Sequence, residues 1–309
     1  MFNIIFNMIK RYCINKINIA TCALILICIL SLGGKDKIIP YVNEEVIKES
    51  NSVIYLLDKD DYVSKVSIFI DKDNIEDIIK EKLIILRDGS EDVLDFKTVI
   101  PKETKINDIK VKEDNVYIDL SKDIIKSNDF ENVIEAIVYS LTEINGINNI
   151  YITIDKEDIN KYSLYNNPLN RHIGINKRYD VNDLKDINMC TMYFVKDNGN
   201  MEYYVPISKV YNSNDEKISI ILDELKSSVY SVDNLESYIS NDLDAYNISK
   251  SENTINIIFN DYIFESIGTD KILEEVKYTI GSSVIDSYGV KEVVFSTKDV
   301  NNIDSFKME

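Results

Sequence analysis

The residue types that carry most enzyme chemistry are scarce in this sequence, which has one histidine and four cysteines among 309 residues. A single histidine excludes zinc sites built from two or three imidazoles, and it excludes acid and base pairs made of two histidines. His172 lies in a polar stretch, so we expect a solvated side chain, with a pH-dependent switch as the alternative. Cys190 fits a small buried residue near the start of a strand better than a reactive thiol.

Carboxylates are the abundant candidates, because the chain has 53 Asp and Glu residues. The segment Asp71 to Asn74 is similar to the start of a calcium-binding loop, but Glu76 replaces the required glycine and Lys82 replaces the bidentate glutamate. This pattern predicts a helix cap instead of a calcium site. The acidic runs Glu44-Glu45 and Asp58 to Asp61 are typical of solvated faces, and a pair of carboxylates that hydrolyses cell-wall glycosides is the alternative.

Serine and tyrosine residues also have a functional and a structural interpretation. Asp119 and Ser121 fit the turn chemistry of a strand end better than nucleophilic catalysis. Tyr117, Tyr139 and Tyr151 fit the faces of strands and helices, and a wall-binding groove is the alternative. The sequence contains no glycine-rich phosphate loop, no GxSxG motif and no CxxC pair. We therefore predict no catalytic, cofactor-binding or metal-binding residues and no cofactor.

Charge is distributed unevenly along the chain. Residues 1–37 hold five Lys or Arg and one Asp, a net of +4, whereas the remainder holds 30 positive and 52 negative groups, a net of −22. Between the basic clusters lies the longest apolar run, Ile19 to Leu32, which is short for a membrane span and fits the core of a signal peptide. Because Lys10, Arg11 and Lys16 precede this run, we expect the acidic remainder to face outward.

Residues 1–36 are thus predicted to be a signal anchor or a signal peptide, and residues 37–51 a connector. An uncleaved anchor, cleavage after Gly33 and a lipid anchor at Cys22 or Cys28 are the open alternatives. The lipid anchor fits least well, because neither cysteine follows the Gly or Ala of a lipobox. The net charge of −18 also argues against a nucleic-acid partner, since phosphate contacts need a basic face.

The remainder of the chain repeats one pattern of elements at a nearly constant offset. The matching elements are a strand pair (53–57 with 63–70, and 191–195 with 201–210), a strand (115–121 and 254–260) and a glycine after a helix (Gly146 and Gly289). Apolar residues at helical spacing predict two helices in each half.

Two helices and four or five strands per half predict an α+β fold. We expect tandem two-layer modules, in which helices pack on one face of a mixed sheet. The predicted boundaries are 52–156 for the first module, 157–186 for a linker, 187–300 for the second module and 301–309 for a tail.

The first half resembles the GerMN domain, a family found in sporulation and germination proteins of endospore-forming bacteria. The resemblance is carried by the first strand pair with its acidic turn, Ile100 to Ile106, Val116 to Ser121, and Ile134 to Glu143 with Gly146 after it. The second half matches less closely, since Ile258 to Asn260 stands where the family has Asp-Leu-Ser. The resemblance covers about Val53 to Asp299.

This resemblance implies a fold similar to ring-building modules and a protein that is not an enzyme. It implies a sporulation or germination protein, membrane-anchored with exported domains that face the space between mother cell and forespore. There it would support assembly of an envelope-spanning complex through protein–protein interaction. The expected partners are other sporulation envelope proteins, with ring formation as one form of assembly. The alternatives from other classes are a peptidoglycan-binding protein and a cell-wall hydrolase that uses two carboxylates.

Overall fold

The computed structural model describes residues 51–183, 185–227, 229–265 and 271–307. These residues belong to one compact unit, Glu49–Glu309. The predicted signal segment, residues 1–36, and nearly all of the predicted connector lie outside the described residues. Within the described ranges, no helix is both long enough and apolar enough to cross a membrane.

Two modules of the same design follow each other along the chain. The first consists of β1 (Ser52–Leu57), β2 (Val63–Ile68), α3 (Ile75–Asp88), β3 (Ile106–Lys112), β4 (Asn115–Leu120), α4 (Phe130–Leu141), β5 (Asn149–Ile154) and β6 (Glu157–Asp158). The second consists of β8 (Ile187–Asp197), β9 (Glu202–Asn212), α5 (Lys217–Lys226), β10 (Ala245–Lys250), β11 (Thr254–Phe259), α6 (Glu274–Tyr288), β12 (Glu292–Thr297) and β13 (Asp304–Lys307). Short 3₁₀ helices lie at Glu91–Val93, Lys122–Lys126, Ile159–Lys161, Arg171–Ile173, Tyr230–Asp233 and Asp261–Ile263.

Each module has its own four-stranded mixed sheet. The strand orders are β3-β4-β5-β6 in the first module and β10-β11-β12-β13 in the second. In both sheets the middle two strands are parallel, β4 with β5 and β11 with β12, and the outer pairs are antiparallel. The helices α4 and α6 form the crossovers between the parallel strands, as parallel pairing requires.

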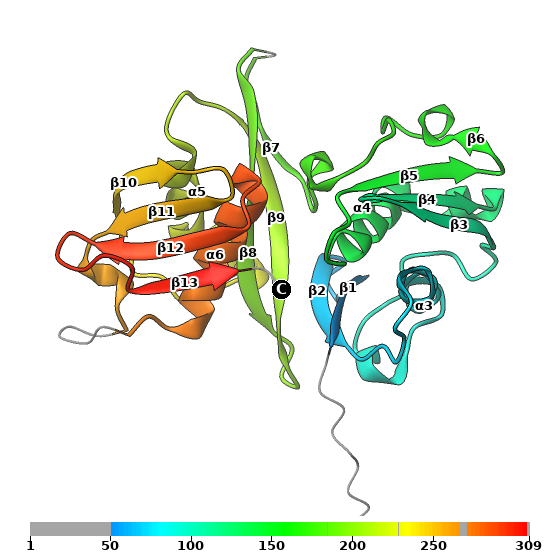
Figure 1. Cartoon of the computed structure of the whole chain (residues 1–309), viewed down its shortest axis with the longest axis horizontal. Coiled ribbons are helices and arrows are strands. Elements are labelled where there is room, and N and C mark those ends of the chain that lie inside the picture. Colours follow the sequence, from blue (N-terminus) through cyan, green and yellow to red (C-terminus); the bar gives the residue numbers. More distant parts are fainter. Residues whose placement is uncertain (1–50, 184, 228, 266–270, 308–309) are drawn as a thin grey trace, which may run out of the picture. The chain divides into compact units, whose positions relative to one another are not determined.

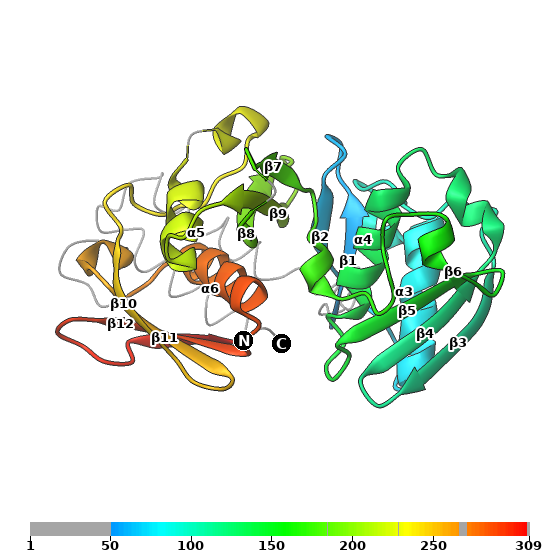
Figure 2. The same ribbon diagram turned by 90° about the horizontal axis from the view of Figure 1, so that it is seen from above.

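The strand pairs that begin the modules meet in a third sheet. Its order is β1-β2-β9-β7, with β8 also paired to β9 and β7 (Arg178–Asp180) parallel to β9. Figures 1 and 2 show α3 and α4 between this central sheet and the first module's own sheet, and α5 and α6 between it and the second module's sheet. The predicted α+β fold of tandem modules is therefore confirmed, and the central sheet adds a layer that sequence reasoning did not place.

Helix α4 shows how the sequence builds this layer. The Asp129 carboxylate accepts a hydrogen bond from the Asn132 N–H at 3.1 Å and caps the helix start. Val133, Ile137 and Leu141 are fully or almost fully buried, so the apolar stripe faces the core of the first module. Burial of each such side chain contributes about 1.5 to 3 kcal/mol.

Helix α6 is built differently, because its buried face consists largely of small residues. Thr279, Gly281, Ser282 and Ser283 are buried, and the helix packs directly on β8. A Cβ atom at Gly281 would lie 2.3 Å from Cδ1 and 2.9 Å from Cβ of Phe306. Glycine therefore allows Phe306 of β13 to lie close against the helix.

Two predicted boundaries differ from the structure. The predicted tail, residues 301–309, contains β13, which pairs with β12 over Asp304–Lys307. The predicted linker, residues 157–186, contains β6 and β7, which pair with β5 and β9. These strands are very short, so the sequence contains no run of alternating residues that would predict them.

We expect Gly281→Ala to destabilise the second module by about 1 to 3 kcal/mol, although alanine normally favours a helix interior by about 1 kcal/mol over glycine. The reason is the overlap with Phe306. Thermal and urea unfolding measure the change. In a Phe306→Ala background the penalty should shrink markedly, and an unchanged penalty there would contradict this explanation.

Candidate functional site

The two residues singled out for their chemistry lie where the sequence predicts them. Cys190 is 1% exposed in β8, and burial raises the pKa of its thiol to about 12. It is therefore a buried protonated thiol, as predicted. His172 lies in the 3₁₀ helix Arg171–Ile173 with an exposed side chain.

The predicted structural roles of three polar residues are confirmed. The Asn74 side chain accepts from the N–H groups of Glu76 and Asp77 and caps α3, so this segment is a helix cap. Asp119 accepts from Thr153 Oγ1 at 2.6 Å, and Ser121 Oγ accepts from a backbone N–H at 3.0 Å. These bonds hold the end of β4 in place.

The three predicted tyrosines fit sheet and helix faces. Tyr117 and Tyr151 stack on neighbouring strands with ring centroids 4.5 Å apart. Tyr139 of α4 is fully buried, and its hydroxyl donates to the carbonyl of Arg171 at 3.1 Å. None of them lines either of the two grooves described below.

The expectation for Asp58 is wrong. Sequence reasoning placed it in a solvated acidic run, but Asp58 is 1% exposed. Its carboxylate accepts from Lys196 Nζ at 2.8 Å and from the Tyr203 hydroxyl at 3.1 Å, and both donors belong to the second module. The burial depends on residues 138 and 145 positions away, which a local charge pattern does not reveal. The other predicted acidic face, Glu44-Glu45, lies outside the described residues.

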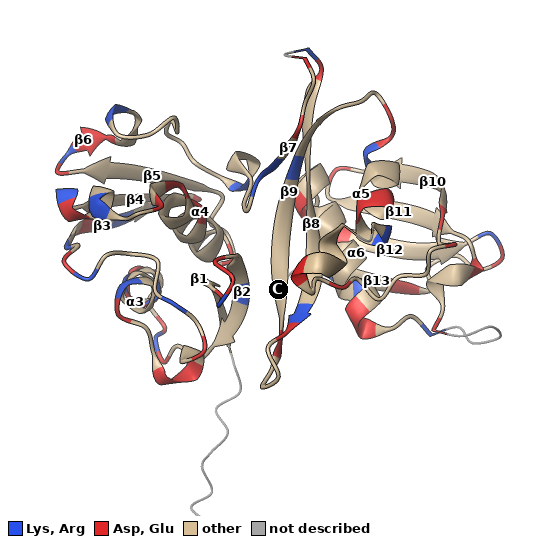
Figure 3. Ribbon diagram, turned by 180° about the vertical axis from the view of Figure 1, so that it is seen from behind, with Lys and Arg blue, Asp and Glu red and all other residues tan. Residues whose placement is uncertain are grey.

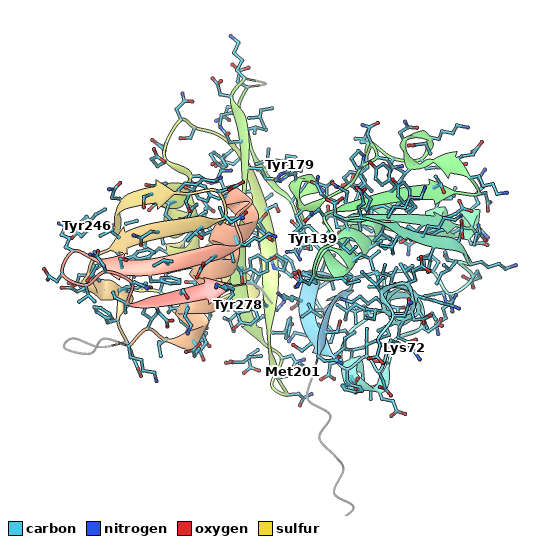
Figure 4. All side chains as sticks on the ribbon, viewed as in Figure 1. Lys72, Tyr139, Tyr179, Met201, Tyr246 and Tyr278 are labelled. Atoms are coloured by element: carbon cyan, nitrogen blue, oxygen red, sulfur yellow. The ribbon has the colours of Figure 1, made fainter. Side chains whose placement is uncertain are left out.

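The densest set of buried polar groups lies where the two modules meet. We call it the junction cluster, and it consists of Tyr55, Lys65, Glu143, Arg171, Tyr193 and Asp286. Figure 4 labels two tyrosines beside it, Tyr139 on α4 and Tyr278 on α6. Acidic residues are spread over both modules in Figure 3, but these charged groups are nearly enclosed, with side chains 3 to 15% exposed.

Arg171 is the centre of the junction cluster. Its Nη1 donates to both carboxylate oxygens of Asp286, at 2.9 and 3.0 Å, and its Nη2 donates to Glu143. Its Nε donates to Thr142 Oγ1 at 3.0 Å, and the guanidinium lies 4.8 Å from the ring centroid of Tyr139. One side chain from the segment between the modules thus binds a carboxylate from each of them.

Lys65 and Arg171 together keep Glu143 ionised. Burial alone would raise the pKa of this carboxyl, but the attraction of the two cations outweighs burial and lowers the pKa to about 2. Lys65 Nζ lies 3.2 Å from the Glu143 carboxylate. Nearby, Lys82 donates to the carbonyls of Val53 and Ser140, and burial lowers its pKa to about 8.

The backbones of the modules are also joined at the central sheet. Strands β2 and β9 pair at Lys65 and Tyr204. Further along β9, Pro206 has no backbone N–H to donate, and the Asn176 side chain forms hydrogen bonds to both strands instead. Its amide donates to the carbonyls of Val63 and Pro206 and accepts from the Val63 N–H, at 2.7 to 2.9 Å.

Two grooves open beside the junction cluster. One has a volume of about 390 Å³, and its lining includes Val66, Tyr203 and Tyr278. The other has a volume of about 480 Å³, and its lining includes Arg171 and the side chains of Asn145, Asn149 and Asn170. Among the described residues, no group of three or more His, Cys, Asp or Glu side chains is arranged to hold a metal ion.

The junction cluster is suited to holding the two modules together and is poorly suited to catalysis. Asp58, Glu135, Glu143 and Asp286 are buried carboxylates, and each forms an ion pair with a lysine or arginine. Glu143 is a poor general acid, because Lys65 and Arg171 outweigh its burial and lower its pKa to about 2, whereas burial raises the pKa of Glu135.

Sequence reasoning did not find the junction cluster, although one signal was present. Tyr55 and Tyr193 are 138 residues apart, an offset of the repeat. Glu143 and Asp286 are separated by the same interval as Gly146 and Gly289, the glycines that follow the matching helices. Polar residues repeated at the module spacing indicate a shared site. Arg171 has no such signal, because it lies between the repeats.

Comparison with known proteins gives findings at three levels. A family model described as "Germane: Sporulation and spore germination" matches residues 53–160. The spore germination protein GerM of Bacillus subtilis (strain 168) is 28% identical over 254 residues, which cover 78% of this chain and 69% of that protein. The solved tandem GerMN domains of the sporulation protein GerM from Bacillus subtilis match with a TM-score of 0.69 at 22% identity, covering 83% of this chain and 96% of that one.

The lowered pKa of Glu143 predicts a loss of stability in acid. This carboxyl titrates at about 2 in the folded chain and at its ordinary 4.5 when unfolded, so the unfolded state binds more protons between these values. The stabilisation is complete above pH 4.5 and is lost as the pH falls toward 2, by roughly 3 kcal/mol. Urea unfolding at a series of pH values measures the loss.

The matched control is Glu143→Gln, which cannot titrate. Its free energy of unfolding should be lower than that of the wild type at pH 7 and should change less between pH 4.5 and 2. An equally steep curve would mean that other groups cause the loss.

Proposed function

We propose that this chain, a GerMN-domain protein similar to the spore germination protein GerM, is a noncatalytic component that supports assembly of an envelope-spanning complex between mother cell and forespore. The similarity to GerM supports a role in sporulation or germination. Assembly, the absence of catalysis, and membrane attachment through residues 1–36 are the further steps of this proposal.

One observation carries the proposal. Buried polar groups join the two modules at the junction, and the carboxylates of Asp58, Glu143 and Asp286 there are paired with cations. Such a junction fixes two copies of one module in a single orientation, which suits a protein that presents surfaces to others. It does not suit a hydrolase, which needs one carboxyl with a raised pKa and another that is free to act as base or nucleophile, because Glu135, whose pKa is raised by burial, is itself paired with Lys177.

Exposed apolar side chains offer places for a partner to dock. Leu94 is 82% exposed and precedes Asp95, which accepts from Asn200 of the second module at 3.1 Å. Val232 is 84% exposed and precedes Asp233, which accepts from the Tyr62 hydroxyl of the first module at 2.8 Å. Each module thus places an apolar side chain next to a loop contact with the other module, and we assign partner docking to these two residues.

The outer strands β3 and β10 are less suited to docking. Each has an irregularity in its pairing, between Ile106 and Asp108 in β3 and between Ala245 and Asn247 in β10. Such bulges, together with lysines on both strands, protect a sheet edge against strand addition. Side-chain docking is therefore favoured over pairing through these edges.

We expect Leu94→Asp with Val232→Asp to abolish recovery of envelope-complex subunits when the tagged full chain is isolated from sporulating cells. Both side chains are exposed, so the fold should be unaffected. Leu164→Asp is the control, because Leu164 is 91% exposed and lies on another loop. Normal sporulation and germination of a deletion strain, together with no recovered subunit for the wild-type chain, would reject the proposal.

Peptidoglycan binding is the second candidate, and the asparagine-lined groove favours it. Asn145, Asn148, Asn149 and Asn170 line this groove with His172, and amides suit the hydroxyl and amide groups of wall glycans. We expect the purified full chain to sediment with cell wall and Asn145→Ala to weaken that binding severalfold. Recovery of the whole chain in the supernatant would exclude this candidate.

A further inference from the structure

Equivalent residues of the two modules contact each other at the junction. The hydroxyl oxygens of Tyr55 and Tyr193 lie 3.4 Å apart, and these residues are 138 positions apart in the sequence. The N–H of Tyr55 donates to Ser140 Oγ, and the N–H of Tyr193 donates to Ser283 Oγ, both at 2.9 Å. The junction therefore resembles a two-fold symmetric interface, to which both partners contribute the same surface.

A two-fold interface of this kind has a weakness. The contacts between tyrosines are the same whichever modules meet, so they would also allow a first module to pair with the first module of another copy. Discrimination requires groups that differ between the modules and that face each other across the junction.

Asp58 and Lys196 are such groups. They are also 138 residues apart, so they occupy equivalent positions, yet one is acidic and the other basic. Their charged atoms lie 2.8 Å apart, and each side chain is 1% exposed. Two first modules would bring two buried aspartates together, and two second modules would bring two buried lysines together.

We propose that Asp58 and Lys196 determine which modules pair, so that the first module accepts a second module and rejects a copy of itself. Neighbouring groups strengthen this choice. Asp60 lies 2.6 Å from Lys196 Nζ, and the Tyr62 ring lies 4.9 Å from it, so the first module presents a site built for a cation. This inference concerns pairing of the modules and does not depend on the proposed function.

Lys196→Asp tests within one full chain whether the first module rejects a copy of itself. The variant places an aspartate opposite Asp58, as the first module of another copy would. Hydrogen exchange at pH 7, with the full chain in detergent, measures opening of β2 and β9, and α4 serves as the internal reference. Breaking a buried ion pair should speed exchange in β2 and β9 by more than about a hundredfold. Exchange in α4 should change less.

Lys196→Met is the matched control, because it removes the cation without adding a like charge. We expect Lys196→Asp to exchange at least about tenfold faster than Lys196→Met in β2 and β9. Equal rates would show that repulsion has no part in pairing, and the inference would be overturned.

The double variant Asp58→Lys with Lys196→Asp decides the question even where a single variant does not fold. The pair is then complementary again with reversed polarity, although Asp60 still favours a cation opposite it. We expect exchange at least about tenfold slower than in Lys196→Asp alone. A double variant that exchanges as fast as the single one would overturn the inference. Lys209→Asp is the control, because its partners Glu224 and Asp180 lie outside this pair. Asp58→Lys should not slow exchange in that variant.

Discussion

The arrangement of the two modules depends on the guanidinium of Arg171, which lies between one carboxylate from each of them. Burying a charge costs several kcal/mol unless partners compensate, and the carboxylate of Asp286 is paired with Arg171 only when both modules are in place. Opening the junction by a small distance would leave charges neither paired nor hydrated. The junction therefore behaves as an all-or-none contact, and the central sheet and the grooves beside it keep their geometry for the same reason. This also explains why a segment between two modules, normally expected to be a flexible linker, is ordered at Arg171 and Asn176: both side chains are structural parts of the junction.

Much of the fold could be predicted from the sequence, because it rests on local patterns and on the repeat. The apolar stripe of α4 and the cap at Asn74 are properties of short segments, and the structure confirms them. The tandem arrangement follows from the nearly constant offset between matching elements. The likeness to ring-building modules stays a prediction. The central sheet escaped prediction because β2 and β9 pair through Lys65 and Tyr204, which are far apart in the sequence, and because Pro206 interrupts the pairing.

The candidate site was harder to predict for a physical reason. Asp58 has the sequence surroundings of a solvated turn, and the cation that pairs with its buried carboxylate, Lys196, comes from the other module. Arg171 lies in a polar stretch whose sequence favours a loop, and its role appears only when Glu143 and Asp286 are brought to either side of it. Local sequence patterns predict which residues a segment buries within its own module, whereas these charges become buried only when two folded modules assemble. Polar residues repeated at the module spacing, such as Tyr55 and Tyr193, are the sequence signal that indicates contacts between the modules.

The asymmetry of the pair Asp58 and Lys196 gains importance if the protein works within an assembly. In a single dilute chain the two modules are tethered, and a short tether gives an effective concentration on the order of millimolar. A second copy at micromolar concentration would then be disfavoured by about a thousandfold, or roughly 4 kcal/mol, without any charge difference. An assembly that gathers many copies on a membrane removes this advantage, because neighbouring chains reach a similar local concentration. Under that condition only a difference between the module surfaces prevents like modules from exchanging, and a buried aspartate opposite a buried lysine supplies it. The same charges that join the two modules of one chain would therefore keep each chain intact among its neighbours.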